Sequence, residues 1–365
     1  MDRSIIIVTG AAGFLGSVVV VDLARDHQVI AIDRRRPTDD LLGAAEGVIW
    51  HEMDLSDQRA VAALFRTTAE KYGRVDFVIH FAAFYSFGTR RWREYDGTNI
   101  RGTANLLRCA TEMRVKRFVF ASSIAAMLPP VVGGILTEAT PTADYIPYAE
   151  SKSVGEKMLR EASDRLPVIM LRIGGVFSDW CELPPLSSLI RMWTSRFPMN
   201  RILAGSGAAG FPYIHRADLV ALVRCCLDKN ERLGASEVLL ACQDGAVLHK
   251  DLWAVVSNAW KGTPIRPLYV PPIAASIGVA VRYMLGCLIG KAPYERPWMM
   301  KYIDRPWIVD TTYTRERLGW DCTAGMGILD RIPAILENLR QHRRRWIIRN
   351  KPQNRRQYTY RCAEL

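Results

Sequence analysis

A tyrosine and a lysine four positions apart, Tyr148 and Lys152, have the spacing that proton transfer to or from an alcohol oxygen requires. On a helix these residues share one face, so the lysine ammonium can lie beside the phenol oxygen and favour the phenolate. An unperturbed tyrosine has a pKa near ~10, and a shift of about 3 units, or roughly 4 kcal/mol, brings it to neutral pH. Tyr148 would then take a proton from an alcohol or return one to a ketone, and Ser123 would hold the substrate oxygen.

A glycine-spaced turn near the start of the chain predicts a dinucleotide site. The apolar run 5–8 indicates a strand, and the glycines behind it are Gly10, Gly13 and Gly16. Glycine lets the backbone approach a pyrophosphate, and the N-terminus of the helix expected next would attract its charge. Asp33 ends the next predicted strand, where a carboxylate accepts hydrogen bonds from the adenosine ribose and favours NAD. Arg34 and the two arginines after it keep NADP as the alternative, because guanidinium groups pair with phosphate.

The elements that must position these residues alternate along the first half of the chain. Apolar runs predict strands at 5–8, 29–32, 48–51, 77–80, 118–120 and 168–172. Helical spacing of apolar residues predicts helices at 58–71, 102–113 and 151–164. This alternation predicts an α/β fold, a doubly wound parallel (Rossmann) sheet with helices on both faces and a ligand crevice at the carboxyl ends of its strands.

Beyond about residue 176 the alternation is lost and prolines become frequent, which predicts a smaller, irregular part that shapes a pocket. Within it we expect helices at 219–227 and 327–346. We therefore expect a dinucleotide-binding domain at 1–176, a substrate-binding part at 177–339 and a basic C-terminal tail at 340–365.

Taken together, the motifs resemble those of the extended short-chain dehydrogenase/reductase superfamily, which includes NAD-dependent epimerases and dehydratases and 3β-hydroxysteroid dehydrogenases. The resemblance covers nearly the whole chain. It implies that Ser123, Tyr148 and Lys152 are the catalytic set, with Asn99 as a structural fourth member. The cofactor-binding positions that the glycine turn and the resemblance imply are Gly10, Gly13, Phe14, Leu15, Gly16, Asp33, Arg34, Asp54, Leu55, Phe81, Ala82, Ala83, Asn99, Tyr148, Lys152, Gly174 and Val176.

Departures from the superfamily's patterns narrow the reaction. Dehydratases carry an acidic pair after the catalytic serine or threonine, whereas Ser123 is followed by an Ile-Ala-Ala segment, which disfavours dehydration. Phe211 stands where nucleotide-sugar enzymes commonly carry an arginine, which favours a less anionic substrate. The arginines of segment 90–93 argue in the opposite direction, since they could grip a phosphate, unless they form a solvated loop. Four tryptophans, at 180, 193, 298 and 307, either wall an apolar pocket or serve as packing anchors.

Our leading hypothesis is an NAD(P)-dependent oxidoreductase, similar to the hydroxysteroid dehydrogenases, that interconverts a secondary alcohol and a ketone on an apolar or cyclic small molecule. The alternative is an NAD-dependent epimerase that acts on a nucleotide sugar. A third class, a non-catalytic protein that senses nucleotides, would bind the cofactor without turnover.

Composition excludes several other classes of protein. A chain with 49% hydrophobic and 24% charged residues is globular rather than disordered. The eight cysteines show no CxxC spacing and the six histidines form no cluster with them, so we expect reduced thiols and no metal. The first residues lead directly into a predicted strand, without the features of a secretory signal, which favours a cytoplasmic location.

Two segments raise the question of a membrane partner. The tail 340–365 has nine Lys or Arg and one acid, so it supplies +8 of the net charge of +12. It is either a solvated helix end or a contact for anionic lipid; we expect no nucleic-acid partner, because no recognition motif accompanies it. The apolar segment 273–290 has Arg282 near its middle, which disfavours a membrane span and favours a buried helix or one lying on a membrane surface. We also expect a homodimer.

Overall fold

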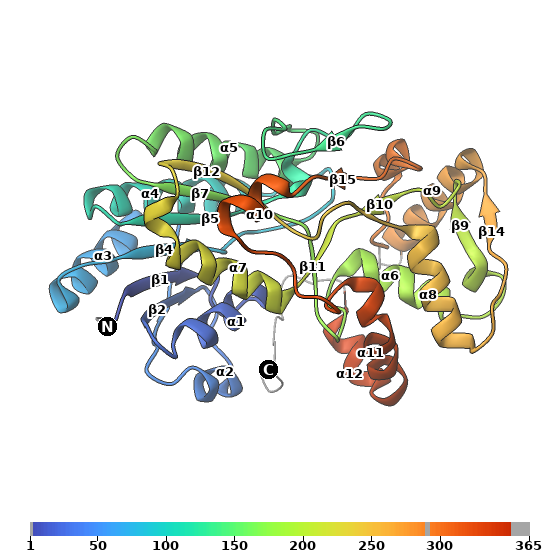
Figure 1. The fold of residues 1–365 in the computed structure, drawn as a ribbon, viewed down its shortest axis with the longest axis horizontal. Helices are drawn as coiled ribbons and strands as arrows, with labels where there is room; N and C mark the ends of the chain where they lie inside the picture. Colours follow the sequence, from blue (N-terminus) through green and yellow to red (C-terminus); the bar gives the residue numbers. More distant parts are fainter. Residues whose placement is uncertain (1–2, 289–292, 352–365) are drawn as a thin grey trace.

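The computed structural model describes residues 3–288 and 293–351. A seven-stranded parallel sheet forms its centre (Figure 1), in the order β12-β7-β5-β4-β1-β2-β3. The strands are β1 (Ile5–Thr9), β2 (Gln28–Asp33), β3 (Ile49–Glu52), β4 (Phe77–His80), β5 (Arg117–Ser123), β7 (Val168–Ile173) and β12 (Ser236–Ala241). The predicted fold class is confirmed.

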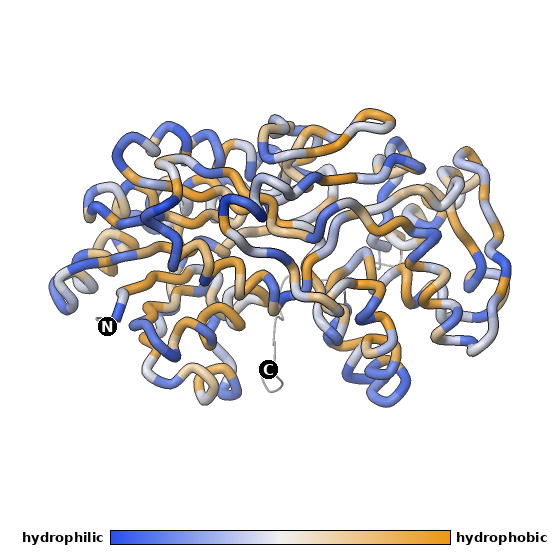
Figure 2. Tube along the Cα trace, in the orientation of Figure 1, coloured by the Kyte–Doolittle hydropathy of each residue, from blue (hydrophilic) through white to orange (hydrophobic). Residues whose placement is uncertain are grey.

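Apolar residues on both faces explain why β1 is a central strand. Ile5 and Ile7 pack into the core on one face of the sheet, and Ile6 and Val8 pack into the core on the other. Successive side chains of a strand point to opposite faces, so a strand covered by helices on both sides is apolar throughout. Figure 2 shows hydrophobic residues concentrated along the central strands.

Two layers of helices cover the sheet. One face carries α1 (Phe14–Leu23), α2 (Asp39–Ala44) and α7 (Arg216–Asp228). The other carries α3 (Gln58–Tyr72), α4 (Gly102–Glu112) and α5 (Pro147–Ala162). A π-helical turn, Tyr95–Arg101, leads into α4, and a short 3-10 helix, η2 (Ile124–Ala126), follows β5.

Most of the remaining elements form a second body with its own core beside the carboxyl ends of the strands. Its helices are α6 (Pro184–Trp193), α8 (His249–Lys261), α9 (Pro272–Leu288), α11 (Ile328–Gln341) and α12 (Arg343–Arg349), and its 3-10 helices are η3 (Met199–Arg201) and η5 (Pro297–Tyr302). Helix α10 (Thr312–Leu318) and the 3-10 helix η4 (Asn230–Arg232) instead lie against the sheet, where Leu318 joins the core of one face and Asn230 accepts from Arg117 of β5. Pairs of short strands lie outside the seven-stranded sheet: β8 (Gly175–Phe177) with β11 (Tyr213–His215), β9 (Ile202–Ala204) with β14 (Leu268–Val270), β10 (Gly210–Phe211) with β13 (Val247–Leu248), and β6 (Ile135–Leu136) with β15 (Ile308–Val309).

The predicted elements and boundaries differ from the structure in a few places. The helix predicted at 219–227 lies within α7, and the one predicted at 327–346 is divided into α11 and α12 at His342. The sheet takes its last strand, β12, from beyond residue 176, so the division into parts at that residue stays a proposal. Residues 289–290 of the apolar segment and 352–365 of the tail lie outside the described residues. Within the described ranges, no helix combines the length and the apolar character needed to cross a membrane.

Candidate active site

A cavity of about 1180 Å³ opens at the carboxyl ends of β1, β2, β4, β5 and β7. Cavities that hold a single small molecule measure about 300–1000 Å³, so this one has room for a cofactor together with a substrate. It lies where the strand order reverses between β1 and β4, the usual ligand position in a doubly wound sheet. Across residues 3–288 and 293–351, no group of three or more His, Cys, Asp or Glu side chains is placed to hold a metal ion.

The glycine turn after β1 has the shape of a pyrophosphate cradle. Gly10 has φ +69°, and a Cβ there would come within 2.7 Å of the backbone nitrogen of Ala82. A Cβ on Gly13 would come within 2.9 Å of the Gly10 carbonyl oxygen. Gly13 is also the N-cap of α1 and, as a glycine, supplies no side-chain hydrogen bond to the start of this helix. These features fit a bound dinucleotide.

Asp33 lies at the end of β2 and braces the same turn. Its Oδ2 accepts a hydrogen bond from the Ala12 amide at 3.1 Å, and its Oδ1 accepts from the backbone amide and the Nε of Arg35, at 3.1 and 3.2 Å. Arg34 and Arg35 also line the cavity. The carboxylate that would contact the ribose is therefore held in place by its own neighbours.

Nearly all of the predicted site residues line the cavity. The predicted residues found there are Gly10, Gly13, Phe14, Leu15, Gly16, Asp33, Arg34, Leu55, Phe81, Ala82, Ala83, Ser123, Tyr148, Lys152, Gly174 and Val176. Asp54 and Asn99 do not line it. Asp54 is exposed and accepts from the Ser56 amide at 2.9 Å, which closes the turn before α3.

Asn99 is buried behind the cavity wall and joins three segments. Its Oδ1 accepts from the Phe84 amide at 2.7 Å, and its Nδ2 donates to the Phe84 carbonyl and to the Ser151 Oγ, at 2.8 and 3.0 Å. It thus fixes the segment after β4 to the first turns of α5.

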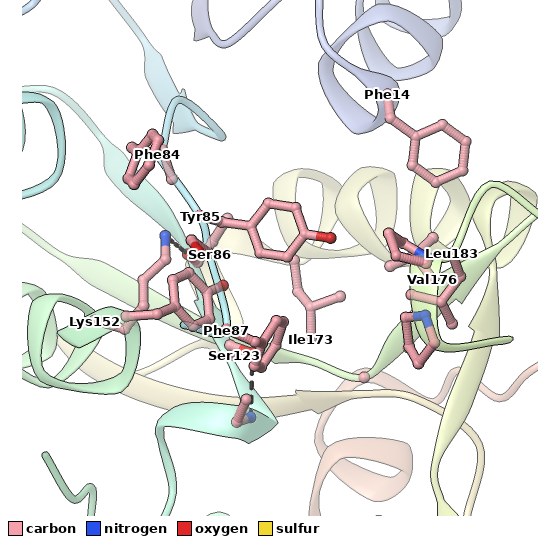
Figure 3. Close-up of a pocket in the computed structure, with 18 of the residues that line it drawn as sticks. Phe14, Phe84, Tyr85, Ser86, Phe87, Ser123, Lys152, Ile173, Val176 and Leu183 are labelled. Atoms are coloured by element: carbon pink, nitrogen blue, oxygen red, sulfur yellow. Dashed lines mark hydrogen bonds between the residues drawn. The ribbon is translucent and has the colours of Figure 1, made fainter. Parts of the chain in front are cut away.

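The three predicted catalytic side chains come from two adjacent elements. Ser123 ends β5, and Tyr148 and Lys152 lie on consecutive turns at the start of α5, which begins with Pro147. Figure 3 shows Ser123 and Lys152 together with the aromatic residues of the segment after β4. Lys152 Nζ donates to the Ala121 carbonyl at 2.5 Å and lies 4.7 Å from the centre of the Phe120 ring.

Burial is the largest influence on the pKa of both Tyr148 and Lys152. Burial raises the pKa of Tyr148 to about 12, and a hydrogen bond with Ser123 only partly opposes this. Burial lowers the pKa of Lys152 to about 7, and the negative charge of Glu156 opposes that shift. Both shifts favour the uncharged forms of the two side chains, because burial removes them from water.

A buried network lies beneath Lys152. Glu156, one turn further along α5, accepts from Ser122 Oγ at 2.6 Å, from Arg172 at 3.0 and 2.9 Å, and from Arg160 at 2.7 Å. Burial by itself would raise the pKa of Glu156, but these hydrogen bonds and the charges of Arg172 and Arg160 keep it below its usual value. Glu156 is therefore a buried anion that favours the protonated form of Lys152.

Most of the aromatic residues that line the cavity were not predicted from the sequence. Tyr85 and Phe87 contact the ring of Tyr148, with centroid distances of 5.9 and 5.5 Å. Tyr85 extends from the segment after β4 toward Phe14 and Leu183 (Figure 3). The other aromatic residues of the wall are Phe81, Phe84, Trp92, Tyr145, Phe211, Tyr213, Tyr294, Trp298, Tyr302 and Trp307. The run of aromatic residues between 81 and 95 was the available signal.

The predicted tryptophans and arginines divide between the cavity and the packing around it. Trp298 and Trp307 line the cavity, whereas Trp180 and Trp193 lie in the core of the second body. Trp92 and Arg93 also line the cavity. Arg91 instead bridges Glu150 and Asp96, at 2.6 and 2.7 Å, and Arg90 stacks on Trp92 at 3.9 Å.

The fold and the cavity define a class of α/β proteins that bind a dinucleotide next to a tyrosine and lysine pair. A model of the NAD-dependent epimerase/dehydratase family matches residues 6–242, and the chain belongs to this family. This membership confirms, at the level of the family, the predicted superfamily, the class of NAD-dependent enzyme and the NAD cofactor.

Two curated relatives illustrate the sequence similarity. UDP-glucose 4-epimerase of Halalkalibacterium halodurans is 36% identical over 156 residues, which span 42% of this chain and 44% of the relative. The dTDP-D-glucose 4,6-dehydratase of Mus musculus is 27% identical over 244 residues, which span 62% of this chain and 65% of the relative. The chain therefore matches less than two thirds of the length of either protein.

Solved structures confirm the fold across almost the whole chain. The UDP-glucose 4-epimerase of Thermotoga maritima with UDP-glucose has a TM-score of 0.69 at 22% identity, covering 92% of this chain and 99% of that one. The UDP-glucose 4-epimerase of Thermus thermophilus with NAD has a TM-score of 0.66 at 20% identity, covering 93% and 99%.

Proposed function

We propose that this protein catalyses the NAD-dependent oxidation of a secondary alcohol and the reduction of the corresponding ketone. The observation that carries the proposal is that Ser123, Tyr148 and Lys152 line the same cavity as the glycine cradle. Proton transfer and hydride transfer at one carbon need this proximity. NAD, when bound, would supply the hydride acceptor or donor.

Each of the three side chains has a distinct part in this chemistry. Tyr148 Oη would remove the hydroxyl proton or return it, and Ser123 Oγ would hydrogen-bond the same substrate oxygen. Lys152 would support Tyr148 from the next helical turn with its positive charge, which Glu156 favours. The aromatic rings of Tyr85 and Phe87 would keep water away from the phenol, so that proton exchange is directed to the substrate.

We propose a nucleotide sugar as the substrate and epimerisation as the net reaction. The UDP-sugar epimerases among the relatives support this alternative better than the apolar substrate of our leading sequence hypothesis. Arg93 and Arg305 line the cavity, where a guanidinium would pair with a diphosphate. Arg305 would supply the charge that Phe211 does not. The apolar η2 segment after Ser123 lacks the carboxylates that water elimination would use, which favours epimerisation over dehydration.

A second candidate, dehydrogenation of an apolar or cyclic alcohol, is compatible with the aromatic wall. Rings such as those of Phe87, Tyr145, Tyr294 and Trp298 offer large apolar surfaces to a hydrocarbon substrate. Sugar rings also stack on aromatic faces, so the wall suits both candidates. The two candidates differ in whether reduced cofactor accumulates during turnover.

The experiment is to assay the purified protein with NAD and with UDP-sugars or cyclic alcohols. Epimerisation converts one UDP-sugar into another, detected by NMR, without a net change in absorbance from reduced cofactor. Dehydrogenation produces that absorbance with the alcohol. Turnover of neither substrate class, despite NAD binding, would contradict the proposed activity and favour a nucleotide-sensing protein.

Tyr148→Phe tests the role of the phenol. It should reduce turnover by about 10²- to 10⁴-fold, because it removes the group that exchanges the proton, while NAD affinity measured by calorimetry stays nearly constant. Tyr72→Phe, at the end of α3 and away from the cavity, is the control and should retain full activity. A fully active Tyr148→Phe protein would refute the acid/base assignment.

Three expectations about the surroundings of the protein stay predictions. These are the homodimer, the cytoplasmic location and a peripheral contact with a membrane. Light scattering would determine the oligomeric state. The membrane contact concerns a different surface, the exposed face of α9.

A further inference from the structure

Helix α9 leaves most of its apolar side chains in solvent. Of its 17 residues only Ala275 and Gly286 are buried. Ile273 and Leu288, at its two ends, are 78% and 82% exposed. The large exposed apolar residues recur at intervals of three, four or one and therefore form one stripe along the helix: Ile273, Ile277, Val281, Met284, Leu285 and Leu288.

Elements at the same end of the molecule expose further apolar residues. β14 lies just before α9 and exposes Leu268 and Tyr269, and it pairs with β9. Phe197 and Met199, which come shortly before β9, are 69% and 41% exposed. Figure 1 shows α9, β9 and β14 at one end of the molecule, away from the first strands of the sheet. We call the α9 stripe with these four residues the α9 surface.

All charged residues in the segments that carry the α9 surface are positive. Segments 190–204 and 261–288 contain no Asp or Glu. Their cations are Arg191, Arg196, Arg201, Lys261, Arg266 and Arg282. Arg282 pairs with Glu295 at 3.4 Å, and Arg196 and Arg266 are exposed. Apolar side chains flanked by cations match a bilayer that presents anionic headgroups above a hydrocarbon layer.

We propose that the α9 surface docks on an anionic lipid bilayer, with α9 lying in the headgroup region parallel to the membrane. A helix of 17 residues is about 26 Å long, shorter than the ~30 Å hydrocarbon core, and Arg282 near its middle opposes insertion across it. The docked geometry instead lets the apolar stripe enter the bilayer while the flanking cations contact the phosphates.

Charge also distinguishes a bilayer from a second copy of the chain. In a two-fold symmetric dimer the same surface faces itself, so exposed cations such as Arg196 and Arg266 would meet their counterparts in the other copy. With no acid in these segments to offset them, the like charges would repel. An anionic bilayer supplies the opposite charge.

The docked surface adjoins the wall of the cavity. Arg282 of α9 pairs with Glu295, which lines the cavity, and Arg296 stacks on Tyr283 of α9 at 5.0 Å. η5, which supplies Trp298 and Tyr302 to the cavity, follows directly. Membrane contact would therefore be made by a helix attached to the substrate side of the site rather than to the cofactor side.

The test is flotation of the full-length chain with vesicles of phosphatidylcholine alone or of phosphatidylcholine mixed equally with phosphatidylglycerol. We expect binding to the anionic vesicles that weakens with salt, and little binding to the neutral ones. Ile277→Glu with Leu285→Glu should reduce that binding by about tenfold or more, because both side chains would have to enter the bilayer. Val132→Glu, at an apolar residue that is even more exposed and lies outside the α9 surface, should bind like the wild type.

Additional variants and measurements separate lipid binding from loss of the fold, from binding by the tail and from dimerisation. Thermal unfolding and NAD binding of each variant verify that the fold is intact, and Arg196→Glu with Arg266→Glu tests the electrostatic part independently. The proposal is overturned if the wild type does not float with anionic vesicles, or if the Ile277→Glu, Leu285→Glu protein floats equally well. It is also overturned if a chain ending at Lys351 no longer floats, which would assign binding to the basic tail, or if the glutamates only convert a dimer into a monomer.

Discussion

Glu156 shows how one buried carboxylate can organise several functional groups. It lies on α5 one turn after Lys152, and Arg172 from β7 pairs with it where both side chains are almost fully buried. Loss of one partner of such a pair leaves the other charge buried and unpaired, at a cost of about 3–5 kcal/mol. The carboxylate therefore joins helix to strand and at the same time favours the charged form of the lysine above it.

Glu156→Gln should lower the free energy of unfolding by about 3–5 kcal/mol at neutral pH, as measured by urea denaturation. The folded pKa of Glu156 lies below its unfolded value, so its contribution is complete above the unfolded pKa and is lost as pH falls through the folded pKa. The difference between wild type and variant should therefore shrink on acidification below about pH 4.5.

Glu161→Gln is the matched control on the same helix. Glu161 is exposed and lies 3.9 Å from Lys157, a surface pair worth little. We expect a pH-independent change of less than about 1 kcal/mol. Equal destabilisation by the two substitutions would contradict the organising role of Glu156.

At the scale of elements, the glycine turn is shaped by contact between backbones rather than by side chains. A Cβ on Gly16 would collide with the Gly10 carbonyl oxygen and lie 2.9 Å from the Cα of Ala11. The turn and α1 must then move apart, and the amides at the start of α1 would no longer converge on one point.

Gly16→Ala should therefore lose NAD affinity by an order of magnitude or more, measured by calorimetry, although alanine is otherwise the better helix former. Gly43→Ala, in α2, is the control, because nothing lies within 4 Å of the added Cβ. Gly43→Ala should retain NAD affinity and unfold at the same or a slightly higher temperature. Unchanged NAD binding in Gly16→Ala would disprove the cradle.

An element can be predicted when the residues that determine it are close together in the sequence. The central strands are marked by local apolar runs and α5 by helical spacing, so the sheet and the relation of Tyr148 to Lys152 were predictable. β12 adds its strand to the sheet after a long excursion through the second body, and no local pattern shows where it pairs. The pKa of Tyr148 was not predictable, since it depends on burial beneath Tyr85 and Phe87.

The aromatic wall illustrates the same limit for the cavity. Phe84 to Phe87 follow β4, whereas Tyr294 and Trp298 come from the other end of the chain. In the sequence each of them is an aromatic residue in an irregular stretch. Only the folded structure shows that they surround the same cavity. Ser123 and the glycines, in contrast, follow strand ends, and the carboxyl ends of parallel strands meet at one edge.

At the scale of the whole molecule, the last described helix is packed against the second body rather than free in solvent. Trp346 of α12 is completely buried, and Arg345 and Arg349 stack on Trp180 at 4.6 and 5.0 Å. Asn350 accepts from the Glu182 amide at 2.7 Å and donates to the Trp180 carbonyl at 2.7 Å. Glu182 lines the cavity at φ +56°, so α12 supports a strained turn of the cavity wall.

Trp346→Ala should lower the free energy of unfolding by about 3–5 kcal/mol, because it empties a large buried volume. Ile348→Ala, on the same helix at a residue 56% exposed, should change it by less than about 1 kcal/mol. Equilibrium denaturation measures both. Similar values for the two variants would mean that α12 contributes no packing energy.

The Trp298 indole donates to the Phe87 carbonyl at 3.0 Å, joining two residues 211 positions apart. On the ribosome the chain emerges from its N-terminus, so the sheet, the glycine turn and Tyr148 are all synthesised before this bond has its donor. The cavity is consequently among the last features to be completed during biosynthesis, and a nascent chain that has already formed its sheet and glycine turn still lacks a closed cavity.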